Sequence, residues 1–225
     1  MVKIGEKIAS IKGQLPAGVR LVAVSKTKSP ELILEAYNSG QRLFGENKAL
    51  EMRDKHEVLP HDIHWHFIGH LQTNKVKYIA PFVNLIHSVD SLKLLAEINK
   101  EAAKNNRIIK CLLQFHIASE ETKFGLSVEE GYELLQSEDF KLMQNIKIAG
   151  IMGMASYSFD NELIRNEFKY LMTIFKNLRY DFFLNDIHFR EVSMGMSGDY
   201  QIAVQEGSTL VRIGSSIFGE RDYTK

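Results

Sequence analysis

Hydrophobic residues along this chain alternate between short continuous runs and longer segments in which they recur every three to four positions. Continuous runs bounded by polar residues predict buried β-strands, whereas the wider spacing predicts amphipathic helices. Runs typical of strands occupy residues 21–26, 42–46, 63–68, 83–88, 109–117, 146–152, 187–193 and 209–213. Because these runs are apolar rather than strictly alternating, they indicate parallel strands that are covered by helices.

Helical spacing appears between the predicted strands. The apolar stripes lie within residues 4–11, 92–102, 128–135 and 164–178. Another helix is expected to begin after Ser29, because Pro30 suits the first helical position and Gly40 suits the position just past the end. Asp160 is the expected cap of the longest helix. Short apolar runs therefore alternate with helices along most of the chain.

This alternation predicts a single (β/α)8 TIM barrel with an additional N-terminal helix. The 225 residues suffice for one such barrel, and the four prolines and the lack of a low-complexity tract or linker favour one domain over residues 1–225. A doubly wound open sheet would show the same alternation. It remains the alternative, because the number of strands alone does not prove that a sheet closes.

Composition and charge narrow the classes of partner. Lys plus Arg and Asp plus Glu both number 28, so the formal net charge is zero and neither nucleic acid nor a membrane is an expected partner. The only cysteine, Cys111, lies in an apolar run and is expected to be a buried structural thiol. A chain without an intrachain disulfide, and without an apolar signal sequence at its charged start, is predicted to be cytoplasmic.

Lys26 is the most informative single residue, because it ends the most apolar of the predicted strands. That position places an amine at the rim of a sheet, where ligands bind. Desolvation there lowers the pKa of a lysine and leaves its amine free to attack a carbonyl. Other lysines near predicted rims are Lys28, Lys48, Lys75 and Lys123. An exposed lysine at a strand end, with no chemical role, is the alternative interpretation.

Two loops of small residues, 193–198 and 212–216, follow the seventh and eighth predicted strands. In β/α barrels a phosphate is often bound at this place, and Ser197, Gly214 and Ser215 could supply a hydroxyl and backbone amides. Either loop alone could simply make a tight turn. A lysine together with a phosphate cup predicts a phosphorylated aldehyde, and pyridoxal 5'-phosphate is the first candidate.

An arginine and two histidines near the predicted strand ends could also take part in chemistry. Arg212 could face the ring nitrogen of such a cofactor, keep it unprotonated and weaken it as an electron sink; a salt bridge to Glu206 or Glu220 is the alternative. His64 and His66 share one face of the third strand, as metal ligands in some barrel hydrolases do. No clear aspartate partner follows the last strand, and the possible ligands lack a matching set, so no metal site is predicted.

Several motifs, in order over residues 21–221, resemble those of the YggS/PROSC-type pyridoxal phosphate homeostasis proteins. They are Val24-Ser25-Lys26-Thr27-Lys28, Phe44-Gly45-Glu46-Asn47, His66-Phe67-Ile68-Gly69-His70-Leu71-Gln72-Thr73-Asn74-Lys75, Lys123-Phe124-Gly125, Gly150-Ile151-Met152-Gly153-Met154, Ser193-Met194-Gly195-Met196-Ser197 and Val211-Arg212-Ile213-Gly214-Ser215. The resemblance implies a barrel like the N-terminal domain of bacterial alanine racemase.

The resemblance also implies a set of cofactor-binding residues. Lys26 matches the Schiff-base lysine of the family, and Arg212 matches the arginine beside the pyridine ring. Ser197, Gly214 and Ser215 match its phosphate-binding positions. The complete implied set is Lys26, Asn47, Met154, Ser193, Ser197, Arg212, Gly214 and Ser215.

The function implied by this resemblance is intracellular pyridoxal phosphate homeostasis, with the cofactor held as a lysine aldimine and with little or no catalytic turnover. Alanine racemase carries a second domain whose tyrosine acts as the opposite base, and this sequence ends at Lys225 without room for it. We therefore expect no catalytic residue and a monomer. The expected partners are pyridoxal phosphate and the apo-enzymes that depend on that cofactor. A small amino-acid racemase and a Schiff-base aldolase for a phosphorylated sugar are the alternatives.

Overall fold

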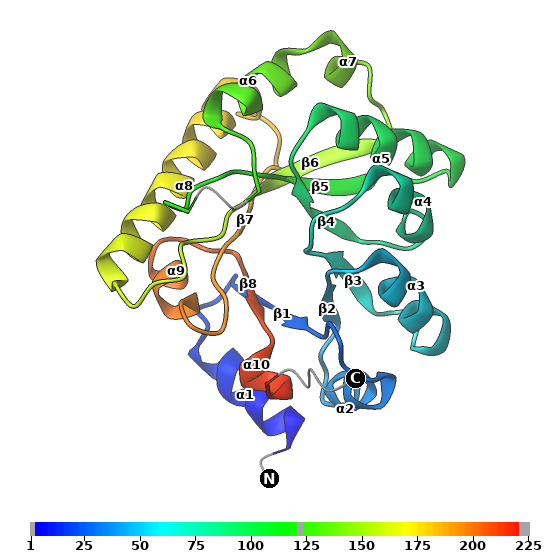
Figure 1. Cartoon of the computed structure of the whole chain (residues 1–225), viewed down its shortest axis with the longest axis vertical. Helices are drawn as coiled ribbons and strands as arrows, with labels where there is room; N and C mark the ends of the chain where they lie inside the picture. Colours follow the sequence, from blue (N-terminus) through cyan, green and yellow to red (C-terminus); the bar gives the residue numbers. More distant parts are fainter. Residues whose placement is uncertain (1–2, 121–123, 221–225) are drawn as a thin grey trace.

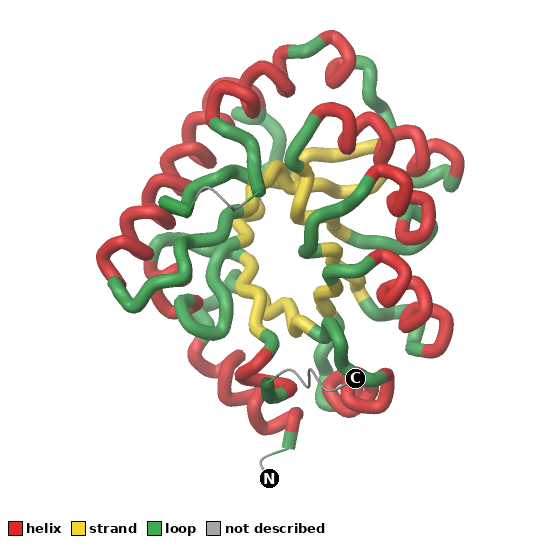
Figure 2. Tube along the Cα trace, in the orientation of Figure 1, coloured by secondary structure: helices red, strands yellow, loops and turns green. Residues whose placement is uncertain are grey.

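Eight parallel strands form a closed barrel in the computed structural model, which describes residues 3–120 and 124–220. Each strand pairs with the next along the chain, and the last pairs with the first through the register Arg20 to Leu210 and Ala23 to Ile213. Figure 2 shows the strands as a central ring with the helices outside it. The predicted eight-stranded barrel is therefore confirmed, and the open sheet is not adopted.

The strands are short and lie close to their predicted positions. They are β1 (Arg20–Val24), β2 (Leu43–Glu46), β3 (His64–Phe67), β4 (Leu85–Val89), β5 (Ile109–Gln114), β6 (Ile146–Met152), β7 (Glu191–Ser193) and β8 (Leu210–Ile213). β6 has the predicted bounds, whereas β7 is shorter than expected. The amide of Phe189 donates to the carbonyl of Asp186, and this turn occupies the predicted start of β7.

Helices connect the strands around the outside of the barrel (Figure 1). They are α1 (Ile4–Gln14), α2 (Pro30–Asn38), α3 (Ala49–Val58), η1 (Thr73–Lys75), α4 (Val76–Ile79), α5 (Leu92–Lys104), α6 (Val128–Gln136), α7 (Glu138–Lys141), α8 (Asn161–Phe182), α9 (Tyr200–Gln205) and α10 (Ser215–Phe218). The predicted additional N-terminal helix is α1, which lies beside α10.

The two predicted helix caps differ in the structure. The Asp160 carboxylate accepts hydrogen bonds from the amides of Glu162 and Leu163, as expected for the start of α8. Ser29 occupies the cap position of α2, but its side chain makes no capping bond to the described helix. Its hydroxyl instead interacts with the carboxylate of Glu31 and lowers the pKa of that group.

The sequence pattern did not predict α3, the helix between β2 and β3. The buried residues of α3 are Ala49, Met52 and Lys55, so a lysine takes the place of an apolar residue in its inward stripe. This substitution removes the apolar periodicity by which an amphipathic helix is detected. The same buried lysine is important at the functional end of the barrel.

Hydrophobic residues form two separate clusters. The larger lies between the strands and the surrounding helices, and it includes Cys111, whose burial raises the pKa of its thiol. The smaller lies inside the barrel and consists of Val22, Leu85, Leu112, Ala149, Met152 and Leu210. Because this inner cluster is small, polar side chains occupy the rest of the interior.

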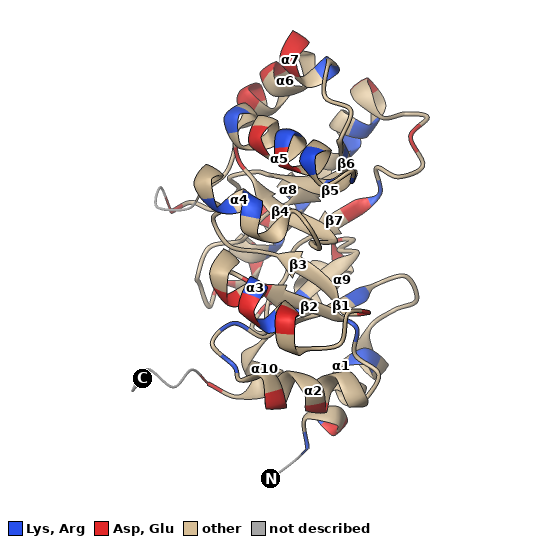
Figure 3. Cartoon of the chain, turned by 90° about the vertical axis from the view of Figure 1, so that its right-hand side faces the viewer, with Lys and Arg blue, Asp and Glu red and all other residues tan. Residues whose placement is uncertain are grey.

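Charged residues of both signs are interspersed over the surface helices (Figure 3), as the balanced composition leads one to expect. Within residues 3–120 and 124–220, no helix combines the length and the apolar character needed to cross a membrane.

Candidate cofactor site

The alternation of side chains along β1 directs Lys26 toward the barrel interior. Val22 belongs to the inner apolar cluster and Ala23 to the outer one, so even-numbered positions of this strand face inward. The strand ends at Val24, but the amide of Ser25 still bonds the carbonyl of Gly45 at 3.0 Å. Lys26 therefore follows directly on the ladder, at the carboxyl end of the barrel, where it is half-buried.

A tight turn follows Lys26. The amide of Lys28 donates to the carbonyl of Ser25 at 3.0 Å, and Thr27, the second of the two residues between them, has a φ of 64°. A β-branched residue is strained in this left-handed region, so the surrounding structure must hold it there. The amide of Thr27 donates to Glu51 Oε1 at 2.6 Å, which provides such a restraint.

A buried ionic network lies behind this turn. Lys55 Nζ donates to Glu46 Oε1 at 2.8 Å, to Glu51 Oε1 at 2.7 Å and to the carbonyl of Ser25 at 2.9 Å. The Ser25 hydroxyl also donates to Glu46 Oε1, at 2.6 Å. Burial raises the pKa of the Glu46 carboxyl, and the charge of Lys55 partly offsets that effect. The network thus fixes the backbone on which Lys26 is carried.

Sequence reasoning missed this network. Its one local signal was the spacing of Glu51 and Lys55, which are four residues apart as in helical ion pairs. That signal does not reveal that Glu46, from the preceding strand, completes the group.

The two small-residue loops meet each other and the end of β1. The Ser197 hydroxyl accepts a hydrogen bond from the amide of Gly214 at 3.3 Å. A Cβ atom at Gly214 would lie 3.1 Å from the carbonyl oxygen of Val24, so this position favours glycine. Ser197 is half-buried and Ser215 is exposed. The structure therefore brings the predicted phosphate-binding loops next to the strand that carries Lys26.

Arg212 lies inside the barrel. Its Nη1 donates to Ser193 Oγ at 2.6 Å and its Nη2 to the carbonyl of Gly153 at 3.2 Å. Burial lowers the pKa of the guanidinium to about 10, so the group remains charged at neutral pH. The alternative salt bridge to Glu206 is not what the structure shows, since Glu206 pairs with Arg165.

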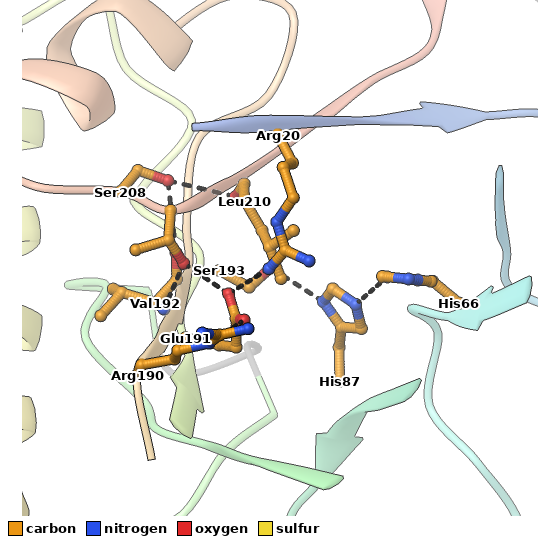
Figure 4. A network of polar contacts seen from close by, with 10 residues as sticks. Arg20, His66, His87, Arg190, Glu191, Val192, Ser193, Ser208 and Leu210 are labelled. Carbon is orange, nitrogen blue, oxygen red and sulfur yellow. Dashed lines mark hydrogen bonds and ion pairs between the residues drawn. The ribbon is translucent and has the colours of Figure 1, made fainter. Parts of the chain in front are cut away.

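From Ser193, which Arg212 also contacts, a chain of hydrogen-bonding contacts runs to two buried histidines; Figure 4 shows the part from Ser193 to His66. His87 Nδ1 lies 2.8 Å from Ser193 Oγ, and His87 Nε2 lies 2.9 Å from His66 Nδ1. Burial, with a smaller contribution from nearby cations, lowers the pKa of His66 to about 3 and also lowers that of His87. Both rings are therefore neutral, and they form a hydrogen-bonded chain through the barrel.

These two histidines should stay neutral at pH 5, where an exposed imidazole with a pKa near 6.5 is mostly protonated. Because their folded pKa values lie below the unfolded value, the neutral rings favour folding above pH 6.5. This contribution is lost as the pH falls through the folded pKa values, of which that of His66 is about 3. The 15N chemical shifts of the imidazole rings, followed as the pH is lowered, measure their protonation. The His66→Gln variant identifies the signals of His66. A midpoint near 6.5 for His66 or His87 would contradict the buried chain.

The two histidines of the third strand, His64 and His66, have different surroundings in the structure. His66 bonds His87 inside the barrel, while His64 is exposed at the start of β3. Among the residues that the structure describes, no three or more His, Cys, Asp or Glu side chains are grouped so as to hold a metal ion. His87 was not singled out in the sequence; its signal was a histidine within an otherwise apolar strand.

Asn47 and Met154 complete the predicted set. The Oδ1 atom of Asn47 is buried and has no hydrogen-bond partner among the described residues, so it can accept a bond from a ligand. Met154 is half-buried and packs against the apolar cluster inside the barrel, next to the Gly153 carbonyl that Arg212 contacts.

A pocket of about 330 Å³ lies beside this set, beyond β2 and β3. Its lining includes Asn47 and Gln72. It also includes Lys48 and Lys75, two of the alternatives to Lys26 as the reactive lysine. Lys26 and Arg212 do not belong to this lining, so the pocket adjoins the predicted site rather than coinciding with it.

Lys28 and Lys123 are the other two alternatives to Lys26 as the reactive lysine. The amine of Lys28 donates to the carbonyl of Glu220 at 2.8 Å. Lys123, which also belongs to one of the family motifs, lies outside the described residues.

The residues at the carboxyl end of the barrel suit a phosphorylated aldehyde with an aromatic ring. Lys26 provides an amine, and Ser197 and Ser215 provide hydroxyls at adjoining loops. Arg212 provides a buried charge, and Asn47 provides a buried acceptor that has no partner among the described residues. This donor set fits the cofactor that the sequence implies.

The chain matches one known family over nearly its whole length. The profile of the family described as alanine racemase, N-terminal domain, matches residues 2–222. A pyridoxal phosphate homeostasis protein of Aquifex aeolicus is 41% identical over 206 residues, which cover 91% of this chain and 88% of that protein. The Homo sapiens protein of the same name is 37% identical over 236 residues, which cover 99% of this chain and 84% of that protein.

Solved structures show the same architecture. PipY of Synechococcus elongatus, determined with PLP bound, is 34% identical, has a TM-score of 0.86 and covers 96% of this chain and 100% of its own. Alanine racemase of Bartonella henselae is 16% identical with a TM-score of 0.71, and the match covers 99% of this chain but 60% of the racemase. The second similarity concerns the fold alone.

Proposed function

Since this chain belongs to the family of pyridoxal phosphate homeostasis proteins, we propose that it binds pyridoxal 5'-phosphate at the carboxyl end of its barrel and takes part in intracellular homeostasis of that cofactor. The observation that carries the proposal is the convergence of β1, which leads to Lys26, with the Ser197 and Gly214 loops. Barrels of this kind commonly bind phosphate at these loops.

Each residue of the site has a distinct part in this proposal. Lys26 supplies the amine that attaches to the aldehyde, while Ser197, Gly214 and Ser215 bind the phosphate. In this proposal Arg212 faces the ring nitrogen, and its bonds to Ser193 and the Gly153 carbonyl hold the guanidinium in one orientation. When bound, the cofactor can act as an electron sink, and a neighbouring guanidinium weakens that capacity because it disfavours protonation of the ring.

Storage and transfer of the cofactor, with little or no turnover, are the proposed activities. Two considerations support this part. Relatives that are 37–41% identical are named for homeostasis rather than for a reaction. The residue proposed to lie beside the ring nitrogen is an arginine, Arg212, rather than a carboxylate. Apo-enzymes that depend on the cofactor are the proposed recipients. A monomeric state and a cytoplasmic location belong to the same proposal.

The absorbance spectrum of the purified protein tests the proposal directly. A yellow protein with a visible band supports pyridoxal phosphate, whereas a protein that stays colourless after incubation with the cofactor contradicts it. Amino-acid racemisation at about 1 per second or faster would place the protein among ordinary enzymes and overturn the carrier role.

The phosphate should dominate retention of the cofactor. We expect pyridoxal to bind at least about a hundredfold more weakly than its phosphate, and Ser197→Ala to weaken phosphate-dependent binding about tenfold, because hydrogen bonds to a charged group contribute about 1.5–3 kcal/mol each. Fluorescence titration of the two ligands measures both effects. Ser10→Ala, on the exposed side of α1, is the matched control. Equal affinity for the two ligands would exclude a phosphate cup.

A further inference from the structure

A second pocket lies at the other end of the barrel from Lys26, at the mouth formed by the amino ends of the strands. Its volume is about 180 Å³. Its lining includes the first residues of five strands, which are Arg20, Leu43, His64, Leu85 and Glu191. This end of a β/α barrel usually serves stability rather than binding, so the cofactor site does not account for a polar pocket here.

Cationic side chains predominate around this pocket. Its described lining contains four permanently charged cations, three histidines and one carboxylate, namely Arg20, Lys110, Lys147, Arg190, His64, His66, His188 and Glu191. Asp186 is an acidic neighbour, 3.9 Å from Lys147 Nζ. Because the whole chain has a formal net charge of zero, this excess of positive charge is local.

The single carboxylate of the lining is already engaged by cations. Glu191 Oε2 lies 2.5 Å from Arg20 Nη2 and accepts a hydrogen bond from Thr209 Oγ1 at 2.9 Å. Glu191 Oε1 lies 3.5 Å from Arg190 Nε. Figure 4 shows both arginine side chains beside this carboxylate. Glu191 therefore holds two guanidinium groups at the edge of the pocket. Its single negative charge cannot offset their two positive charges.

His66 belongs to the lining and is almost completely buried. Its pKa is lowered first by burial and then by the charges of Arg20, His64 and Lys110. The positive potential of the surrounding residues thus extends to the buried part of the pocket.

We propose that this pocket binds a small phosphate-bearing anion, either inorganic phosphate or a phosphate monoester. Guanidinium groups match the oxygens of a phosphate in geometry and charge, and lysines add further donors. A pocket of about 180 Å³ accommodates a tetrahedral group with few additional atoms. Since the two ends of the barrel are separate, this site does not depend on the one proposed for the cofactor.

NMR titration of the cofactor-loaded protein tests this site, because the phosphate loops at the carboxyl end are then occupied. Inorganic phosphate, added at constant ionic strength against chloride, should produce saturable shifts at the amides of Arg20, Lys110 and Arg190 and at the His66 ring. Glycerol 3-phosphate serves as the monoester. Tighter binding of the ester assigns the pocket to phosphate monoesters, and tighter binding of the free ion assigns it to phosphate.

A double variant locates the effect. Lys110→Gln with Arg190→Gln should weaken phosphate binding at least tenfold, which corresponds to 1.4 kcal/mol. Both side chains are exposed, so the fold should persist; a thermal melt verifies this, and Lys110→Gln alone serves if the double variant fails to fold. Lys93→Gln on α5 is the matched control. Unchanged affinity, shifts that do not saturate, or shifts confined to Ser197 and Gly214 would each overturn the proposal.

Discussion

A Lys26→Ala variant should lose the visible absorbance of the bound cofactor completely, because the amine that attaches to the aldehyde is removed. Non-covalent contacts through Ser197 and Arg212 would still allow weak binding. The fold should change little, by about 0.5 kcal/mol or less in the free energy of unfolding, since substitutions at half-exposed rim positions are usually of this size. Spectra before and after borohydride reduction, followed by peptide mapping, provide the measurement.

Lys28→Ala is the matched control, because it removes an amine two residues away on the same turn. It should keep the visible band, since the Lys28 amine contacts the Glu220 carbonyl. If Lys26→Ala remains yellow and borohydride still yields a lysine adduct, another lysine holds the cofactor, and Lys48 and Lys75 beside the neighbouring pocket would be examined first.

Lys55→Met should destabilise the protein by about 3–5 kcal/mol, the usual cost of leaving a buried charge without its partner. Glu46 is completely buried and the Lys55 side chain is 7% exposed, so solvent does not replace the lost contact. The Ser25 carbonyl would lose its Lys55 bond at the same time. Chemical denaturation at pH 7 measures the change in the free energy of unfolding.

The pH dependence of this variant follows from the raised pKa of Glu46. A carboxyl whose folded pKa lies above its unfolded value favours folding below about 4.5 and loses that contribution as the pH rises through the folded pKa. Lys55 normally limits this rise, so its removal enlarges the effect. The deficit of Lys55→Met relative to the parent protein should therefore be largest at neutral pH and shrink toward pH 4.5.

The double variant Glu46→Gln with Lys55→Met separates charge from packing. It removes the buried carboxylate at position 46, while Glu51 keeps the Thr27 amide as a donor, so it should be more stable than Lys55→Met alone, with a deficit that varies less with pH. Additive effects of the two substitutions would show that the two groups do not interact, contrary to their 2.8 Å contact.

The barrel could be predicted because strand and helix periodicities are local properties of the chain. β6 has the predicted bounds, and α8 begins after the predicted cap, Asp160. The pattern failed where tertiary contacts decide the structure. In α3 a buried lysine, Lys55, interrupts the apolar stripe because its partner, Glu46, lies on the strand β2. Likewise β7 is shortened by a turn at Asp186.

The predicted site shows the same division. Lys26, Ser197 and Gly214 were identified from their places at strand ends, and the structure brings their segments together. Their role toward the cofactor remains a prediction. The contacts of Ser193 could not be inferred from the pattern. Arg212 meets Ser193 from the neighbouring strand β8, in a register that the sequence does not reveal, and His87 on β4 meets it only across the closed barrel.

The chain formed by His66, His87 and Ser193 has a direction. Each neutral imidazole carries one N–H, so either His66 donates to His87 and His87 to Ser193, or Ser193 donates to His87 and His87 to His66. Reversing one bond requires reversing the other, so the interior dipole has two opposite orientations. In the first orientation the Ser193 proton is available to an acceptor near Arg212; in the second it is not. A ligand that accepts this proton would therefore set the tautomer of an imidazole at the far mouth of the barrel.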